Sequence, residues 1–216
     1  MIKAIIFDYD GVIAESNFIK TEAMEILFEK EGKEIQSKVV KYHLLNEGIS
    51  REEKFKYFYK NLLKKDYTKK DINHLSKKFS DLVLKKVIDS KKVHGVYDFL
   101  ENNYKNFLFF ISTGTPNEEI NKIIRKTNMK KFFRLCLGSP KKKEDHISLI
   151  LKDFLLKKEQ LLFVGDSLTD VEAAKKFNID FILRLHSGNK ILAEERNLRV
   201  IKDFNDLEIL LKTNYS

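Results

Sequence analysis

Two aspartates, Asp8 and Asp10, follow an apolar run near the start of the chain, in the stretch IIFDYDGVIAES. A glycine comes directly after them, and Asp and Gly are also common in the simple turns that end strands. The stretch alone therefore allows either a strand-ending turn or a reactive pair of carboxylates. The ends of the other strands distinguish the two interpretations.

Polar residues also follow two later apolar runs, FLFFIST and LLFVGD. They are Ser112, Thr113, Gly114, Asp166 and Asp170. In an open parallel sheet the carboxyl ends of the strands meet at one edge, where the crevice of α/β proteins lies. If these strands are parallel, the side chains meet Asp8 and Asp10 there.

Such a group of residues suits phosphoryl transfer. Carboxylates of Asp8, Asp10 and Asp166 are the oxygen ligands that Mg²⁺ binds together with phosphate and water. Without a cation, three neighbouring carboxylates would repel one another. The polar loop after FLFFIST enters a helix and forms a natural seat for phosphate. A lysine from the run Lys141, Lys142, Lys143 would complete an anion, metal and lysine set.

Residues 1–16 and 92–216 predict an α/β core, because short apolar runs alternate there with amphipathic helices. We expect a Rossmann-like parallel sheet that is covered on both faces. The expected strands are 1–8, 107–113, 134–138, 161–166 and 181–185. The expected helices are 95–104, 116–126, 144–156, 168–177 and 205–212.

Residues 17–91 have a helical pattern that no strand-like run interrupts, which predicts an α-helical domain inserted after the first strand. The expected helices cover 18–32, 50–63 and 71–88. Ser50 with Glu53 three residues later is a capping-box arrangement at the start of a helix.

The composition limits the partners. The formal charge is +9, but only six of the 41 basic residues are arginine, and the lysines are mixed with acidic residues. No cluster of base-reading arginines occurs, so nucleic acid is not an expected partner. The lysine-rich surface favours anionic substrates. None of the five histidines, His43 and His186 included, has the spacing of metal ligands.

The expected location is the cytoplasm, as a monomer or homodimer without a membrane partner. No signal-peptide core or membrane-spanning run is visible. Cys136 is the single cysteine, which excludes an intrachain disulfide, and we expect a buried, inert thiol.

Four motifs resemble those of the haloacid dehalogenase-like (HAD) superfamily: DYDGVIAES, ISTGTP, a lysine after GSP, and VGDSLTDVEAA. The resemblance covers the whole core, and the helices of 17–91 match the family's helical cap. It implies a phosphatase of the branch with a cap after the first strand. The carboxylate at position 10 accompanies phosphate chemistry in this family, whereas the true dehalogenases lack it.

The resemblance also implies a role for each motif residue. Asp8 would be the nucleophile that forms an aspartyl-phosphate, and Asp10 would be the general acid and base. Asp8, Asp166 and the backbone carbonyl of Asp10 would hold Mg²⁺. Asp170 would orient the metal's water or the lysine.

Two assignments remain open at this point. Either Ser112 or Thr113 fits the second motif, and Thr113 is favoured because Gly114 after it allows the backbone to approach phosphate closely. The active-site lysine is Lys141, Lys142 or Lys143. Lys143 is favoured by its spacing to the apolar positions of the following helix.

The segment YHLLNEGISREEKF contains a glycine turn between two expected helices. By resemblance, such a loop on the cap faces the site and selects the leaving group, so Asn46, Glu47 and Arg51 are candidate substrate-binding residues. The alternative is an ordinary helix-turn-helix with a solvated polar loop.

The leading hypothesis is a Mg²⁺-dependent hydrolase of a small phosphorylated metabolite, a phosphate monoester. A sugar phosphomutase has the same architecture, and a phosphonate hydrolase would need a Schiff-base lysine in the cap. A non-enzymatic phospho-accepting signalling module would take phosphate on a later strand and has no room for the helical insert. The sequence does not identify the substrate.

Overall fold

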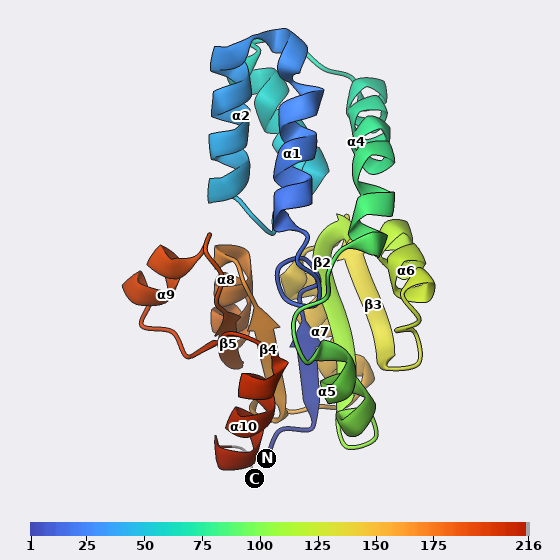
Figure 1. The fold of residues 1–216 in the computed structure, drawn as a ribbon, viewed down its shortest axis with the longest axis vertical. Helices are drawn as coiled ribbons and strands as arrows, with labels where there is room; N and C mark the ends of the chain where they lie inside the picture. Colours follow the sequence, from blue (N-terminus) through green and yellow to red (C-terminus); the bar gives the residue numbers. More distant parts are fainter. Residues whose placement is uncertain (215–216) are drawn as a thin grey trace.

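The computed structural model describes residues 1–214 and is built around a six-stranded parallel sheet (Figure 1). The strand order is β3-β2-β1-β4-β5-β6. The strands are β1 (Ala4–Phe7), β2 (Leu108–Pro116), β3 (Phe133–Ser139), β4 (Leu161–Gly165), β5 (Asp180–Arg184) and β6 (Val200–Ile201). All neighbouring pairs are parallel, which confirms the predicted α/β class.

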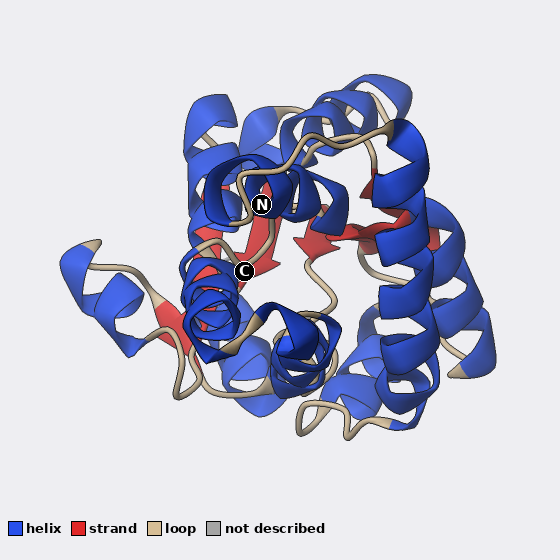
Figure 2. Cartoon of the chain, turned by 90° about the horizontal axis from the view of Figure 1, so that it is seen from above, coloured by secondary structure: helices blue, strands red, loops and turns tan. Residues whose placement is uncertain are grey.

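Alternate side chains of each strand pack on opposite faces of the sheet. Ile5 and Phe7 of β1 belong to one core cluster, and Ala4 and Ile6 belong to the other. The first face is covered by α5 (Val96–Asn103), α6 (Asn117–Lys126) and α10 (Phe204–Asn214), the second by α7 (Lys143–Asp153) and α8 (Leu168–Phe177). Seen from above, the strands lie between helices on both sides (Figure 2).

Besides α5, four α-helices lie between β1 and β2 in the chain, within residues 17–89, which we call the insert. They are α1 (Asn17–Leu27), α2 (Lys33–Leu45), α3 (Arg51–Tyr57) and α4 (Lys69–Asp89). Figure 1 shows α1, α2 and α4 at one end of the molecule, beyond the carboxyl ends of the strands. The insert therefore covers the sheet edge where the chemistry is expected. Its treatment as a separate domain stays a prediction.

Local signals set the ends of the insert helices. Ser50 accepts a hydrogen bond from the Glu53 N–H at 3.3 Å, as the capping-box pattern predicted. α3 continues as a π-helical turn over Phe58–Leu62. The helix expected at 18–32 already ends at Leu27, because a short 3₁₀ turn and Gly32 at φ +89° follow.

Several elements differ from the expectation. β2 runs to Pro116 rather than Thr113, because pairing with β3 resumes there after an irregularity. Three elements were not expected from the sequence: α2, α9 (Lys190–Glu195) and the two-residue β6. Their apolar patterns are too short or too mixed to predict a helix or a strand.

One expectation about burial holds. Cys136 is buried, and burial raises the pKa of its thiol to about 11, which makes it inert. Within residues 1–214, no helix combines the length and the apolar character that crossing a membrane requires.

The aromatic cluster around Phe7 should anchor the strand that carries Asp8. Phe7 is fully buried, and its ring lies 5.5 Å from Phe109 and 5.7 Å from Phe204 between centroids. Phe7→Ala should lower the free energy of unfolding by about 3–5 kcal/mol, measured by urea denaturation, because a large cavity remains. Phe18→Ala is the matched control, since Phe18 is 77% exposed, and should change it by less than about 0.5 kcal/mol. Similar losses in both variants would contradict this account of the core.

Candidate active site

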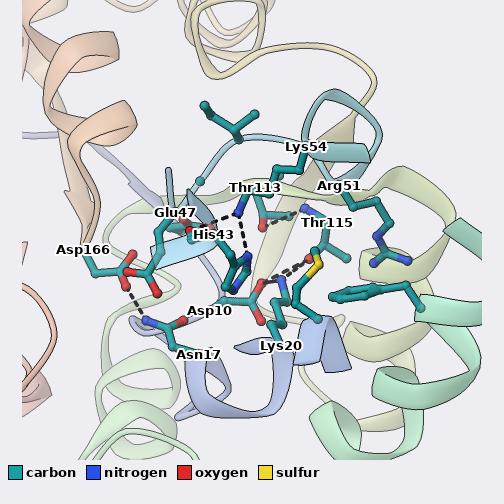
Figure 3. A pocket seen from close by; sticks show the side chains of 16 residues that line it. Asp10, Asn17, Lys20, His43, Glu47, Arg51, Lys54, Thr113, Thr115 and Asp166 are labelled. Carbon is teal, nitrogen blue, oxygen red and sulfur yellow. Dashed lines mark hydrogen bonds and ion pairs between the residues drawn. The ribbon is translucent and has the colours of Figure 1, made fainter. Parts of the chain in front are cut away.

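The structure brings the predicted strand-end residues together at one edge of the sheet, beneath the insert. A cavity of about 60 Å³ is lined there by Asp8, Asp10, Thr113, Gly114 and Asp166, with further residues from the insert (Figure 3). Parallel pairing of β1 with β2 and β4 puts the ends of these three strands side by side. The topology alone therefore assembles the core half of the site.

Of the three candidates Lys141, Lys142 and Lys143, it is Lys143 that reaches this edge of the sheet. Its ammonium donates to Asp8 Oδ2 at 2.8 Å and to Asp170 Oδ1, and all three side chains are at most 5% exposed. Burial alone would lower the pKa of Lys143, but the two carboxylates outweigh this effect and raise it. Lys141 and Lys142 are exposed.

Asp170 orients Lys143 and the loop before α8. Its Oδ2 accepts hydrogen bonds from Ser167 Oγ at 2.5 Å and from the Ser167 N–H at 3.1 Å, while Oδ1 accepts from Lys143. Both oxygens are therefore occupied. Of the two roles predicted for Asp170, orienting the lysine fits these contacts, and a part in holding the metal or its water stays a prediction.

Asp8, Asp166 and Asp170 form a buried acidic group whose ligand atoms lie within 4.8 Å of one another. Burial raises the pKa of Asp8 to about 6, against the effect of Lys143, and nearby Asp170 and Asp10 raise it further. Negative charge is thus in excess at this point. A cation held by the carboxylates of Asp8 and Asp166 fits the charge and the donor set.

Asp10 is held as a carboxylate. Its Oδ1 accepts from Ser16 Oγ at 2.6 Å, and its Oδ2 accepts from Thr115 Oγ1 at 3.0 Å and from Lys20. Burial raises its pKa, but the Lys20 ammonium and these hydrogen bonds outweigh burial and lower it. Asp10 can therefore accept a proton in this arrangement.

Thr113, not Ser112, faces the cavity. Ser112 Oγ lies 2.8 Å from His146 Nδ1 and is fully buried, whereas Thr113 lines the cavity. Alternation along β2 makes the two side chains point to opposite faces. Ser112 is therefore not brought to the site, which corrects its place among the substrate-binding candidates.

The insert touches the core through two glycines. A Cβ on Gly114 would lie 2.7 Å from the carbonyl oxygen of Gly48. Gly48 adopts φ +84°, and a Cβ there would lie 1.9 Å from Thr169 Oγ1 and 3.2 Å from Lys143 Nζ. The sequence predicted that phosphate would lie close to the backbone of Gly114. In this structure the backbone of Gly48 lies close to Gly114 instead.

Of the insert residues predicted to bind substrate, Glu47 and Arg51 line the cavity and Asn46 does not. Glu47 lines the cavity, and burial, together with nearby Asp166, raises its pKa to about 7. Asn46 donates to the Tyr42 carbonyl of its own helix at 2.9 Å and does not line the cavity. Its predicted contact with substrate is therefore not supported, because the side chain folds back on α2.

Arg51 also lines the cavity, but its guanidinium is occupied by the core. It forms a paired contact with Glu119 of α6, at 2.7 and 3.0 Å, and lies 4.6 Å above the Phe79 ring. Ser80 Oγ accepts a further bond at 2.7 Å. Arg51 therefore joins the insert to α6, and its predicted role in substrate selection stays a prediction.

Four residues at the site were not predicted: Lys20, His43, Lys54 and His186. His186 Nε2 lies 3.1 Å from Asp166 Oδ2 and, with Glu47, forms a second group of possible metal ligands. It follows β5, so the strand-end argument that found Asp166 would have found it. Lys20 and Lys54 lie among many lysines, and no spacing distinguishes them.

Residues 5–184 match the family model described as haloacid dehalogenase-like hydrolase. The chain belongs to this family. That membership confirms the prediction that the protein is an enzyme of the HAD-like hydrolase type.

Individual relatives are more distant. A probable phosphoglycolate phosphatase of Pseudomonas savastanoi is 31% identical over 102 residues, which cover 44% of this chain and 64% of that protein. A predicted phosphoglycolate phosphatase from Haemophilus somnus has a similar structure, with a TM-score of 0.75 at 18% identity over 97% of both chains. The β-phosphoglucomutase of Clostridium difficile reaches a TM-score of 0.78 at 19% identity, over 98% of this chain and 96% of its own. At these identities the two structures show the fold alone.

The pair Arg51–Glu119 should stabilise the contact between insert and core. Arg51→Ala should lower the free energy of unfolding by about 3 kcal/mol, because it leaves Glu119 partly buried without its partner. The double variant with Glu119→Ala should cost less than the sum of the single changes, as a double-mutant cycle measures. The exposed pair Lys86–Glu22 is the control, and Lys86→Ala should cost less than about 1 kcal/mol. Additive effects of Arg51→Ala and Glu119→Ala would contradict the coupling.

Proposed function

We propose that the protein is a Mg²⁺-dependent hydrolase of a small phosphate monoester that works through an aspartyl-phosphate on Asp8. The observation that carries the proposal is the buried contact of Asp8 with Lys143, beside Asp166 and Asp10, at the end of β1. Membership in the hydrolase family and the relative called a probable phosphoglycolate phosphatase support it.

In the first step a carboxylate oxygen of Asp8 attacks phosphorus, and the bond from phosphorus to the ester oxygen breaks. Lys143 donates to Asp8 and can also neutralise charge on the phosphoryl oxygens, as a cation does in phosphoryl transfer. Thr113, which lines the cavity, offers a hydroxyl to the same group.

The pair of Asp10 and Lys20 donates a proton to the leaving oxygen and later accepts one from water. The leaving oxygen takes a proton from this pair, in which Lys20 is the cationic partner, and leaves as an alcohol. Water then attacks phosphorus of the aspartyl-phosphate and gives its proton to Asp10. Inorganic phosphate forms and Asp8 is regenerated. The lowered pKa of Asp10 keeps this carboxylate unprotonated and therefore able to accept a proton in the second step.

Asp8 and Asp166 are the residues that would hold the metal, with the backbone carbonyl of Asp10 as implied by the family. Bound Mg²⁺ supplies positive charge beside the transferring phosphoryl group. Asn17, which donates to Asp166 Oδ2 at 2.8 Å, keeps that carboxylate turned toward the site.

Two adjacent cavities share Gly48, Thr113 and Gly114: one of about 60 Å³ beside Asp10 and one of about 220 Å³ beside Lys143. The match to a hydrolase family favours hydrolysis over the phosphomutase reaction of the β-phosphoglucomutase named above.

Asp8→Asn should reduce turnover of small phosphate monoesters at least about 10³-fold, because it removes the attacking charge. Folding should survive, since Lys143 keeps Asp170 as a partner. Asp153→Asn on exposed α7 surface is the matched control and should keep full activity. A steady-state assay of phosphate release measures both. Turnover within tenfold of wild type in Asp8→Asn would rule out the covalent mechanism.

Mg²⁺ should stabilise the protein through Asp8 and Asp166. At 100 times its dissociation constant, a ligand that binds only the folded state adds about 2.7 kcal/mol, which raises Tm by about 5–10 °C for a chain of this size. The shift should disappear in Asp166→Asn and persist in Asp153→Asn, as thermal unfolding at matched ionic strength measures. An equal shift in Asp166→Asn would place the ion elsewhere.

A further inference from the structure

Lys54 is a buried cation that lines the cavity without a carboxylate partner. It comes from α3, is 3% exposed and lines the cavity with its side chain directed at His43 (Figure 3). Its ammonium lies 3.0 Å from His43 Nδ1 and 3.5 Å from the His43 carbonyl oxygen. Among residues 1–214, no acidic side chain comes within 4.0 Å of it.

The other cations at the site differ from Lys54 in this respect. Lys20 pairs with Asp10, Arg51 pairs with Glu119, and Lys143 pairs with Asp8 and Asp170. Each buried positive charge is thus balanced within the protein. Lys54 is the exception in the described part of the chain.

His43 cannot balance this charge. Burial and the neighbouring Lys54 ammonium lower the pKa of His43 to about 2, so its imidazole is neutral and accepts a hydrogen bond from Lys54. The charged groups that act on Lys54 are Lys20, Glu47, Asp10 and Lys143, and burial with Lys20 lowers the pKa of Lys54 to about 7. An ammonium in this position is costly until an anion approaches it.

On the basis of the proposed function, we propose that Lys54 binds an anionic group on the leaving-group part of the substrate, specifically a carboxylate. Asp8, Lys143 and Thr113 deal with the phosphoryl group, which all phosphate esters share. Lys54 contacts none of these residues and belongs to the insert. No second cation without a carboxylate partner lines the cavity in the described part of the chain, so the position matches the single charge of a carboxylate better than the charges of a second phosphate.

The test compares 2-phosphoglycolate with its primary amide, which has nearly the same shape but no negative carboxylate. Wild type should prefer the acid by about 100-fold in kcat/KM, since loss of one partner of a buried charge pair has effects of this order. In Lys54→Met the preference should fall to about one. Lys56→Met is the matched control, since Lys56 is exposed on the same helix, and should keep the wild-type preference.

Stability gives a second readout that does not depend on activity. Lys54→Met removes a buried charge without a carboxylate partner and keeps the side chain's length, so its Tm should equal or exceed that of wild type. A Tm far below wild type would overturn the description of Lys54 as unbalanced.

The outcomes separate this inference from the proposed function. If wild type hydrolyses neither ester nor any other phosphate monoester with Mg²⁺, the proposed function fails. If it hydrolyses both equally, or if Lys54→Met keeps the preference for the acid, only the role of Lys54 fails. A short bisphosphate preferred over the acid would overturn the carboxylate assignment. If borohydride traps an aldehyde substrate covalently on Lys54, then Lys54 forms a Schiff base, and the proposal that it recognises a carboxylate by charge is wrong.

Discussion

Four buried carboxylates lie at the carboxyl ends of β1 and β4, and the rest of the site is arranged around their charge. Asp8, Asp10, Asp166 and Asp170 are each at most 8% exposed. Buried carboxylates are tolerated only when cations or hydrogen-bond donors face them. This requirement accounts for Lys143 between Asp8 and Asp170, and for the hydroxyls around Asp10. The charge that remains uncompensated lies where a metal cation fits.

In the proposed mechanism the insert takes part in the chemistry as well as covering the site. Lys20 on α1 balances Asp10 and lowers its pKa, so the pair proposed to transfer protons spans the insert and the core. The Gly48 turn meets Gly114 and Lys143 at distances that leave no room for a side chain. Arg51 ties α3 to α6 through Glu119. Opening the insert would separate these partners, so closure and the state of the catalytic groups are physically linked.

A shared fold does not determine which reaction occurs. A predicted phosphoglycolate phosphatase and a β-phosphoglucomutase both superpose on this chain at less than 20% identity. In the proposed mechanism the residues around the phosphoryl group suit any phosphate ester, so the choice of substrate depends on the side chains that reach the leaving group. Glu47, Lys54 and His43 of the insert line the cavity and are the side chains proposed to make this choice.

The sequence by itself determined the parallel sheet and the core half of the site. Strand-ending residues such as Asp8 and Asp166 share one edge in any parallel sheet, so local patterns were sufficient to group them. Spacing to the following helix favoured Lys143 over its two neighbours, whereas tertiary structure alone identified Lys20 and Lys54, which have the same local pattern as the surface lysines. It also paired Arg51 with Glu119, which lies 68 residues further along the chain. Side-chain pairing across such separations depends on packing between elements, which neither periodicity nor spacing encodes.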